Sequence, residues 1–175
     1  MFYTNKGKIF FFSNVIDFFL LFTMNSTHTD VITAEILINP FQLHAIQDYV
    51  DEKLSHLEKH IFSTEHGYID RILSKKSISF VSTCFATHDG SMIFEVKFNA
   101  LCTNPQPNDI VQCIIFLNED IMVGVSGPMH ILIKNNNDDY SKSIKKNDKV
   151  MVCVIKTGFD IKKNVIRVLA NLIQQ

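Results

Sequence analysis

The sequence lacks the residue arrangements by which common enzyme active sites are identified. It has no glycine-rich phosphate-binding loop, no HExxH zinc motif, no GxSxG nucleophile turn and no clustered pair of carboxylates. Its seven histidines are scattered, and the acidic residues of Asp70-Arg71 and Asp138-Asp139 have no visible catalytic companion. These absences favour a binding or assembly protein over an enzyme, although residues that meet only in the folded chain would escape such a search.

Cysteine is scarce and unpaired in the sequence. None of the four cysteines forms a Cys-x-x-Cys pair, and no histidine pair lies at ligand spacing beside them. A structural zinc site needs four convergent ligands, usually in close sequence pairs. We therefore expect no metal site and no cofactor, and we interpret all four as buried thiols in a reducing compartment: Cys84, Cys102, Cys113 and Cys153.

A large excess of charge of either sign is also missing. Apolar residues make up 46% of the chain and charged residues 20%, which is typical of a globular protein and not of a disordered one. The net charge of −1 argues against a protein whose whole surface binds nucleic acid. The charge is uneven, however, because residues 134–167 contain nine basic against four acidic residues, a net charge of +5. One local surface could therefore bind phosphate.

The first 23 residues differ in character from the rest of the chain. Two lysines precede a short apolar run, and a second apolar stretch covers residues 15–22. A secretory signal peptide, a membrane-spanning helix and translation that begins at Met24 instead of Met1 are the alternatives. Polar residues interrupt the apolar run, and a spanning helix needs about 20 nearly unbroken apolar residues. We favour a start at Met24 and expect residues 1–30 to be an N-terminal extension that is disordered or not translated.

The next segment, residues 31–104, has the pattern of a small α+β domain. Asn39, Pro40 and Gln42 predict a capped helix start, and an apolar stripe at spacings of three and four extends to Ile61. Asp89-Gly90 is a strong hairpin signal. The predicted order is strand, helix and three further strands, with the strands at 31–38, 68–73, 77–85 and 92–102.

The rest of the chain, residues 105–175, is predicted to be an all-β domain. The prolines within Asn104–Asn108 mark the boundary. Five short strands with a long polar loop, Lys134–Asp148, after the third match the rhythm of an OB barrel. Its strands are predicted at 110–117, 121–125, 129–133, 150–156 and 165–172, and a turn at 158–164.

Four segments resemble one protein family. Asp89–Ala100 is similar to the centre of the RNA polymerase stalk subunit, the family of the seventh subunit of eukaryotic polymerase II and of its archaeal counterpart, where D-G-S leads into F-x-V-K-[YF]-x-A. Gly124–Ile133 resembles the family's barrel segment with its V-G-P-M, His66–Ile69 its F/Y-G-Y-I, and Val31–Phe41 its opening strand and helix start. The resemblance is collinear from about residue 31 to residue 172.

The resemblance implies a non-catalytic stalk subunit of a multisubunit DNA-directed RNA polymerase. It implies a truncated-RNP-like tip domain that docks on the large catalytic subunits near the clamp, followed by an OB barrel that faces the nascent RNA. The family's usual helical partner subunit is present, reduced or missing; the sequence leaves this open. By position, the core-polymerase-binding tip would be formed by Gly67, Tyr68, Asp89, Gly90 and Ser91.

An OB barrel binds RNA through a basic groove with aromatic faces. We expect weak, sequence-independent and salt-sensitive binding. The candidate residues lie in the basic second half of the chain: Lys134, Tyr140, Lys142, Lys145, Lys146, Phe159, Lys162 and Lys163.

Other interpretations concern the function and the source of the chain. A free-standing OB-fold RNA-binding protein is the alternative function, and a secreted or membrane-tethered protein rests on residues 1–23 alone. Abundant Asn, Ile, Lys and Phe suggest an AT-rich genome, and with the divergence from the family they suggest a large DNA virus. The expected location is the nucleus or cytoplasm, or the virion for a viral protein, and we expect neither secretion nor a membrane partner.

Overall fold

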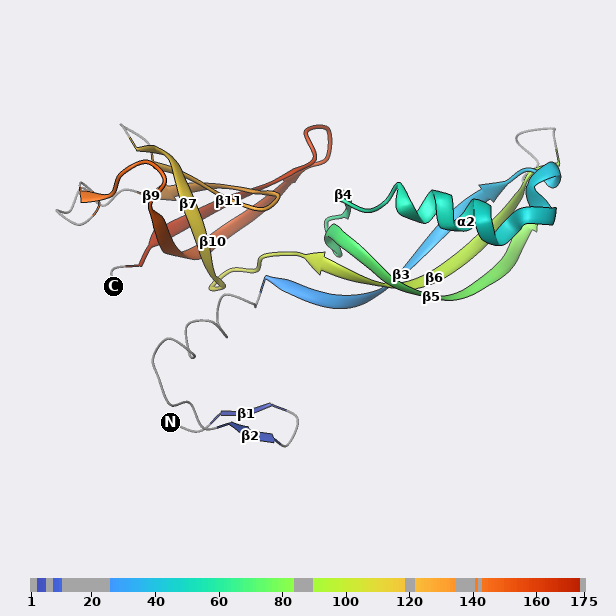
Figure 1. Cartoon of the computed structure of the whole chain (residues 1–175), viewed down its shortest axis with the longest axis horizontal. Coiled ribbons are helices and arrows are strands. Elements are labelled where there is room, and N and C mark those ends of the chain that lie inside the picture. The colour runs from blue at the N-terminus through green and yellow to red at the C-terminus, as the bar shows by residue number, and fades with distance from the viewer. Residues whose placement is uncertain are drawn as a thin grey trace.

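The computed structural model describes residues 3–5, 8–10, 26–83, 90–118, 122–134, 141 and 143–173. Figure 1 shows that most of these residues form two parts placed end to end, a sheet with a helix across it and a barrel. Two short strands, β1 (Tyr3–Asn5) and β2 (Lys8–Phe10), form a separate antiparallel pair. The favoured start at Met24 and the apolar residues 15–22 lie outside the described residues.

The sheet has four antiparallel strands in the order β3-β6-β5-β4. A 3-10 helix, η1 (Pro40–Ala45), leads directly into α2 (Ile46–Ser55). The strand bounds are Thr27–Ile38 for β3, His60–Ser63 for β4, Gly67–Thr83 for β5 and Met92–Thr103 for β6.

One face of the sheet forms the core with α2. Ile32 and Phe98 are fully buried on neighbouring strands, where their alternation with exposed residues directs them to the same side. Val50 and Leu54 of α2 pack against them. Burying an aliphatic or aromatic side chain of this size contributes about 1.5–3 kcal/mol, so this face holds the helix on the sheet.

The predicted helix start is confirmed, but the predicted helix end is wrong. Asn39 accepts a hydrogen bond from the backbone N–H of Phe41, and Gln42 completes the capping box. The α-helix ends at Ser55, and the backbone turns at Lys59 with a φ of +62°. Ile61, expected on the helix stripe, is instead buried in strand β4.

Two further boundaries differ from the prediction. The predicted strands 68–73 and 77–85 are one strand, β5, whose pairing with β6 continues through four register shifts. The expected extension through residue 30 is wrong for Thr27–Asp30, because these residues form the start of β3. The pairing of Thr27 with Thr103 holds them in the sheet.

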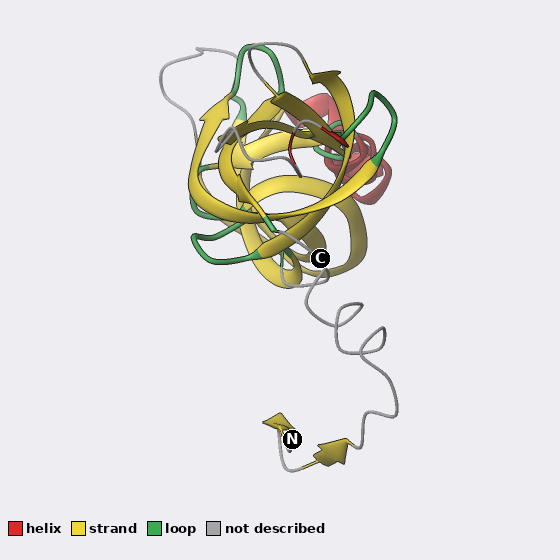
Figure 2. Cartoon of the chain, turned by 90° about the vertical axis from the view of Figure 1, so that its left-hand side faces the viewer, coloured by secondary structure: helices red, strands yellow, loops and turns green. Residues whose placement is uncertain are grey.

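The barrel contains the five strands that the sequence predicts and closes in the order β10-β11-β9-β8-β7. Figure 2 looks onto the barrel end of the molecule and shows the strands as a ring. All neighbours are antiparallel except β9 and β11, and β10 closes the ring by pairing with β7, an OB-like arrangement. The strand bounds are Ile110–Asn118 for β7, Met122–Ser126 for β8, Met129–Lys134 for β9, Lys149–Asp160 for β10 and Val165–Leu172 for β11.

The barrel core is aliphatic and tightly packed. Ile115, Ile131 and Ile166 are fully buried in it. Gly124 is needed on β8, because a Cβ there would lie 2.6 Å from the Sγ of Cys113. Strand β10 extends through Gly158–Asp160, which were expected in a turn, so the turn itself covers only Ile161–Asn164.

Hydrogen bonds join the barrel to the sheet and to the linker that follows the sheet. The side chain of Asn164, in the β10–β11 turn, accepts from Ile61 N–H at 2.9 Å and donates to the carbonyl of Lys59 at 2.7 Å. At the linker, Thr157 Oγ1 donates to the carbonyl of Pro105 at 2.7 Å. Figure 1 shows the turn reaching toward β4. We call the Asn164 contact the clasp.

The cysteines are only partly as predicted. Cys102 and Cys113 are buried and reduced, and burial raises their pKa to about 11 and about 12. Cys153 is half-buried, which corrects its prediction as a buried thiol, and Cys84 lies outside the described residues. None of the helices in the described ranges has the length and apolar character that a membrane crossing requires.

Candidate nucleic-acid interface

The outer surface of β7, β8, β9 and β11 carries rows of exposed and half-buried side chains that run across the strands. Neighbour pairing places Ile114 beside Val125, Val125 beside His130 and His130 beside Arg167. The next row runs from Val123 through Leu132 to Leu169 and Lys156. We call this surface the outer band. It contains the second and third strands of the barrel, where OB-like barrels bind oligonucleotides.

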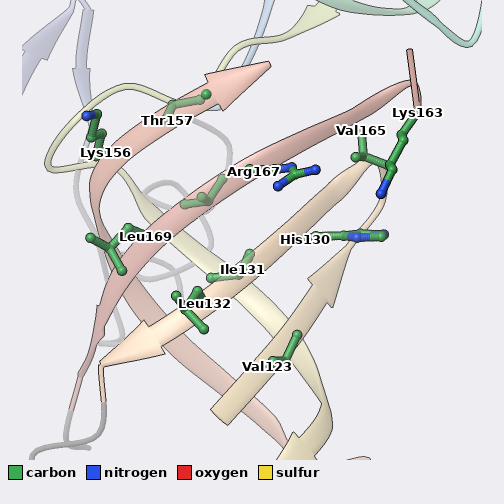
Figure 3. Close-up of a pocket in the computed structure, with 12 residues that line it drawn as sticks. Val123, His130, Ile131, Leu132, Lys156, Thr157, Lys163, Val165, Arg167 and Leu169 are labelled. Atoms are coloured by element: carbon green, nitrogen blue, oxygen red, sulfur yellow. The ribbon is translucent and has the colours of Figure 1, made fainter. Parts of the chain in front are cut away.

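The outer band is hollowed over β9 and β11. A shallow groove of about 710 Å³ is lined by His130, Leu132, Lys156, Lys163 and Arg167, among others. Figure 3 shows His130, Lys163 and Arg167 gathered toward one end of this groove and Leu132 and Leu169 toward the other. Nitrogen donors beside an apolar floor are suited to a ligand with a phosphate backbone and flat bases.

One carboxylate moderates the charge at the basic end of the groove. Asp160 accepts a hydrogen bond from the backbone N–H of Lys163 and forms an ion pair with Arg167. These contacts, the Lys163 bond first, lower the pKa of Asp160 from 3.8, so it stays ionised at neutral pH. Arg167 is thereby held in place while part of its charge is neutralised.

An aromatic ring lies at the other edge of the outer band. Phe116 of β7 is 62% exposed, and the Nζ of Lys146 lies 5.2 Å from the centre of its ring. Ile114, two residues before it, is also exposed. An exposed ring next to a cation is a suitable surface for stacking an unpaired base.

The sequence-predicted RNA-binding residues are spread around the barrel. Lys134 is exposed at the end of β9, and Lys145 and Lys146 are exposed before β10. Lys162 and Lys163 are exposed in the β10–β11 turn. Phe159 is half-buried against the barrel core. Its ring is therefore not open for stacking, which corrects the expectation that it binds RNA. Tyr140 and Lys142 lie outside the described residues.

The sequence-predicted tip residues are not brought together. Gly67 and Tyr68 begin β5 next to Thr103, and Tyr68 packs against the barrel core. Burial, and then the charge of Asp70, raises the pKa of Tyr68. Both residues therefore belong to the junction with the barrel.

Gly90 and Ser91 lie at the opposite end of the sheet, before Met92. Gly90 is exposed with a φ of +75°, whereas Ser91 is buried, and Asp89 lies outside the described residues. The twelve residues of β6 separate the two groups. One continuous surface cannot contain both, because a strand rises about 3.3 Å per residue.

The end of the sheet far from the barrel, which we call the distal end, exposes large apolar side chains. Phe41 is 85% exposed just after Pro40, whose ring lies close to Gly90. Phe80 is exposed on β5 and packs edge-on against Phe94. Leu43 and Val81 are also exposed there. Several large exposed apolar side chains at the same end of a sheet favour a contact surface for another protein.

Sequence reasoning missed His130, Arg167 and Lys156 as members of the outer band. The alternation of Met129–Lys134 was a usable signal, because it directs His130 and Leu132 to the face opposite the buried Ile131. Pairing with β11 brings Arg167 beside His130, and no local pattern reveals that neighbour. Within the described ranges, no three His, Cys, Asp or Glu side chains are close enough to hold a metal ion.

Comparison with known proteins gives no relative for this chain: no protein-family model matches the sequence, and no curated protein matches it significantly.

Proposed function

We propose that this protein is a non-catalytic stalk subunit of a multisubunit DNA-directed RNA polymerase, with the four-stranded sheet and α2 as a truncated-RNP-like tip domain. The observation that carries the proposal is that two different contact surfaces lie on different parts of the molecule, one on the sheet and one on the barrel. The apolar distal end, with Phe41 and Phe80, is on the sheet, and the basic outer band is on the barrel. The collinear resemblance to the stalk family supports the same assignment.

The distal end is the docking surface in this proposal. Phe41 and Phe80 are large, exposed apolar side chains of the kind that anchor protein interfaces. They replace Gly67 and Tyr68, which are used at the barrel junction. Gly90 stays part of the docking surface, because it lies beside Pro40 at the same end.

The outer band is the RNA-guiding surface. His130, Lys163 and Arg167 provide contacts to phosphate, and Phe116 provides one stacking face. With so few contacts, binding is weak and independent of base sequence, and it declines as salt rises. Such a surface suits transcript that is held near the polymerase by the docked distal end.

Affinity purification of the tagged full chain from its native source tests docking. Wild type is expected to recover the large catalytic polymerase subunits, and a Phe41→Asp/Phe80→Asp variant to lose them, because both side chains are exposed at the distal end. Leu73→Asp, an exposed apolar residue elsewhere on β5, is the matched control and retains them. Recovery of no polymerase subunit by wild type contradicts the proposal.

A free-standing OB-fold RNA-binding protein is the second candidate, and the outer band is the observation that favours it. In that case the wild-type chain recovers RNA without polymerase subunits. The Phe41→Asp/Phe80→Asp variant then recovers as much RNA as wild type, because those residues are on the sheet and not on the barrel.

A further inference from the structure

Among the described residues, strand β3 lies at an edge of the sheet and has few of the features that protect an edge, its charged residues being Asp30 and Glu35. It has β6 as its neighbour on one side, and all twelve residue pairs run without a register shift. Its sequence contains no proline and no lysine. By contrast, β5 carries Lys75 and Lys76 and four register shifts along its pairing. Because regular, unprotected edges add further strands readily, β3 is suited to accept one.

The backbone groups that face the free edge can be identified. Val31 N–H donates to the side chain of Asp30 at 2.7 Å instead of to β6. Along an antiparallel strand these directions alternate, so the backbone groups of Thr33, Glu35 and Leu37 face the same free edge as those of Val31. Because the N–H of Val31 already donates to the side chain of Asp30, the first edge-facing N–H that an added strand can bind is that of Thr33.

A groove lies beside these same positions. It has a volume of about 850 Å³ and lies on the helix side of the sheet, along residues 33–37 of β3. Tyr49 and Lys53 of α2, with Leu57 and Phe62 after it, line the groove. Alternate side chains of an added strand would enter this groove, which favours apolar residues at those positions.

The opposite face of the sheet carries an unbalanced negative charge at the same level. Glu35 lies directly opposite Glu95 on β6, an unfavourable pairing of like charges. Lys97 forms an ion pair with Glu95 at 3.1 Å. Across the part of the chain that the structure describes, no ion pair includes Glu35. A cation on an added strand next to Glu35 would therefore be favourable.

We propose that the free edge of β3 binds an extended peptide segment of a partner protein, with a Lys or Arg opposite Glu35 and an apolar residue on each side of it. The peptide adds as a fifth strand, its apolar side chains enter the groove beside α2, and its cation faces Glu35. A second copy of this chain fits less well, because antiparallel pairing centred on the groove would place Glu35 opposite Glu35. The inference is independent of the polymerase assignment.

A designed peptide tests this site. The probe is the nine-residue peptide Thr-Val-Thr-Val-Lys-Val-Thr-Val-Thr with a fluorophore, and its partner probe has Glu in place of Lys. Fluorescence anisotropy with the purified full chain should show binding of the Lys peptide and about fivefold weaker binding of the Glu peptide, from one cross-strand charge pair. Amide hydrogen exchange should slow at Thr33, Glu35 and Leu37.

Variants of the edge separate this site from other surfaces. Glu35→Lys, a change at an exposed position, should reverse the preference between the two peptides. Thr33→Pro removes an edge-facing N–H and should abolish binding, since proline is tolerated on an edge but cannot donate. Thr29→Pro on the same edge, outside the groove, is the matched control and should bind as wild type does.

Three outcomes overturn the proposal. The first is equal binding of the Lys and Glu peptides, and the second is exchange protection that falls on β5 or on the barrel instead of β3. The third is protection of Thr33, Glu35 and Leu37 that rises with protein concentration in the absence of peptide, which identifies a second copy as the occupant. Each of these results leaves polymerase recovery through the distal end unaffected, so the two proposals fail separately.

Discussion

Gly67 has a φ of +79°, and a Cβ at this position would lie 2.4 Å from the carbonyl oxygen of Thr103. Gly67→Ala should therefore destabilise the chain by roughly 2–4 kcal/mol, from left-handed backbone strain and overlap together. Urea unfolding measures the change. Gly158→Ala is the control, because a Cβ there would meet no atom within 4 Å, and it should change stability little. Equal stability of wild type and Gly67→Ala would show that this position does not require glycine.

Asp30 is a second residue whose role at the junction end of the sheet can be measured. The hydrogen bond from His66, and then that from Val31 N–H, lower its pKa from 3.8 against the opposing effect of burial. A lowered folded-state pKa adds stability that is fully present above pH 3.8 and is lost as the pH falls through the lowered value.

We therefore expect Asp30→Asn to be less stable than wild type at pH 6, with the gap closing as the pH approaches 2. The contribution is modest because the side chain is partly exposed. Urea midpoints measured from pH 6 to pH 2 test this. A gap that stays constant over this range would show that the ionised carboxylate is not the stabilising group.

At the scale of elements, the pairing of β10 with β11 places the negative charge of Asp160 beside the positive charge of Arg167 in the outer band. Asp160 competes with any phosphate for Arg167. Asp160→Asn should raise the affinity for single-stranded RNA about threefold at low salt, the size of one exposed ion pair. Arg167→Ala should weaken binding and reduce the salt dependence by about one phosphate contact.

Fluorescence titration with a short oligonucleotide at several salt concentrations measures both effects. Asp109→Asn is the matched control, since that carboxylate is bound to the linker backbone at Gln106 and not to the outer band. Unchanged RNA affinity in both Asp160→Asn and Arg167→Ala would remove the groove from the interface.

Local patterns predicted some elements well and others poorly, for identifiable reasons. The start of the helix at Asn39 was predictable because capping uses neighbouring residues only. The continuity of β5 was not, because polar residues 74–77 interrupt the apolar pattern while pairing with β6 holds the backbone extended. Ile61 fits a helical stripe by spacing, but the turn at Lys59 and pairing with Tyr68 place it in β4.

The candidate site was predictable only in part. A basic second half identified Lys163, and alternation in β9 would have identified His130. The grouping of these residues with Arg167 depends on the parallel β9–β11 pair, and that pairing is set by barrel closure and not by adjacent residues. In the same way, Gly67 and Gly90 looked like one surface because nothing local reveals that β5 is a single strand from Gly67 to Thr83, which puts the two glycines at opposite ends of the sheet.

At the scale of the whole molecule, the clasp fixes how the barrel is held on the sheet. Asn164 has a φ of +54° and makes two hydrogen bonds to the backbone of Lys59 and Ile61. Asn164→Gly keeps the backbone conformation accessible but removes both bonds, so it should widen the distribution of distances between sheet and barrel. Loss of two such bonds costs about 1–3 kcal/mol.

Double electron–electron resonance between spin labels on α2 and on β9 measures that distribution of distances. Lys163→Gly, at the neighbouring turn residue, is the control and should keep a narrow distribution, because the Lys163 side chain forms no hydrogen bond or ion pair with the sheet among the described residues. A distribution that is equally narrow in Asn164→Gly would show that the linker contact at Thr157 and the packing of Tyr68 on the barrel core are sufficient.

The register of β3 also sets an order of events during synthesis. Thr27 pairs with Thr103, so the first strand of the sheet has its partner only after β6 has left the ribosome. At about 5–20 residues per second, the chain between them takes roughly 4–15 s to make. Throughout that interval the apolar side chains of β3 have no sheet to enter, whereas the barrel strands follow one another closely. Nascent chains of this protein should therefore need chaperone protection early, and any codon change that slows translation between β3 and β6 should lower the yield of folded protein.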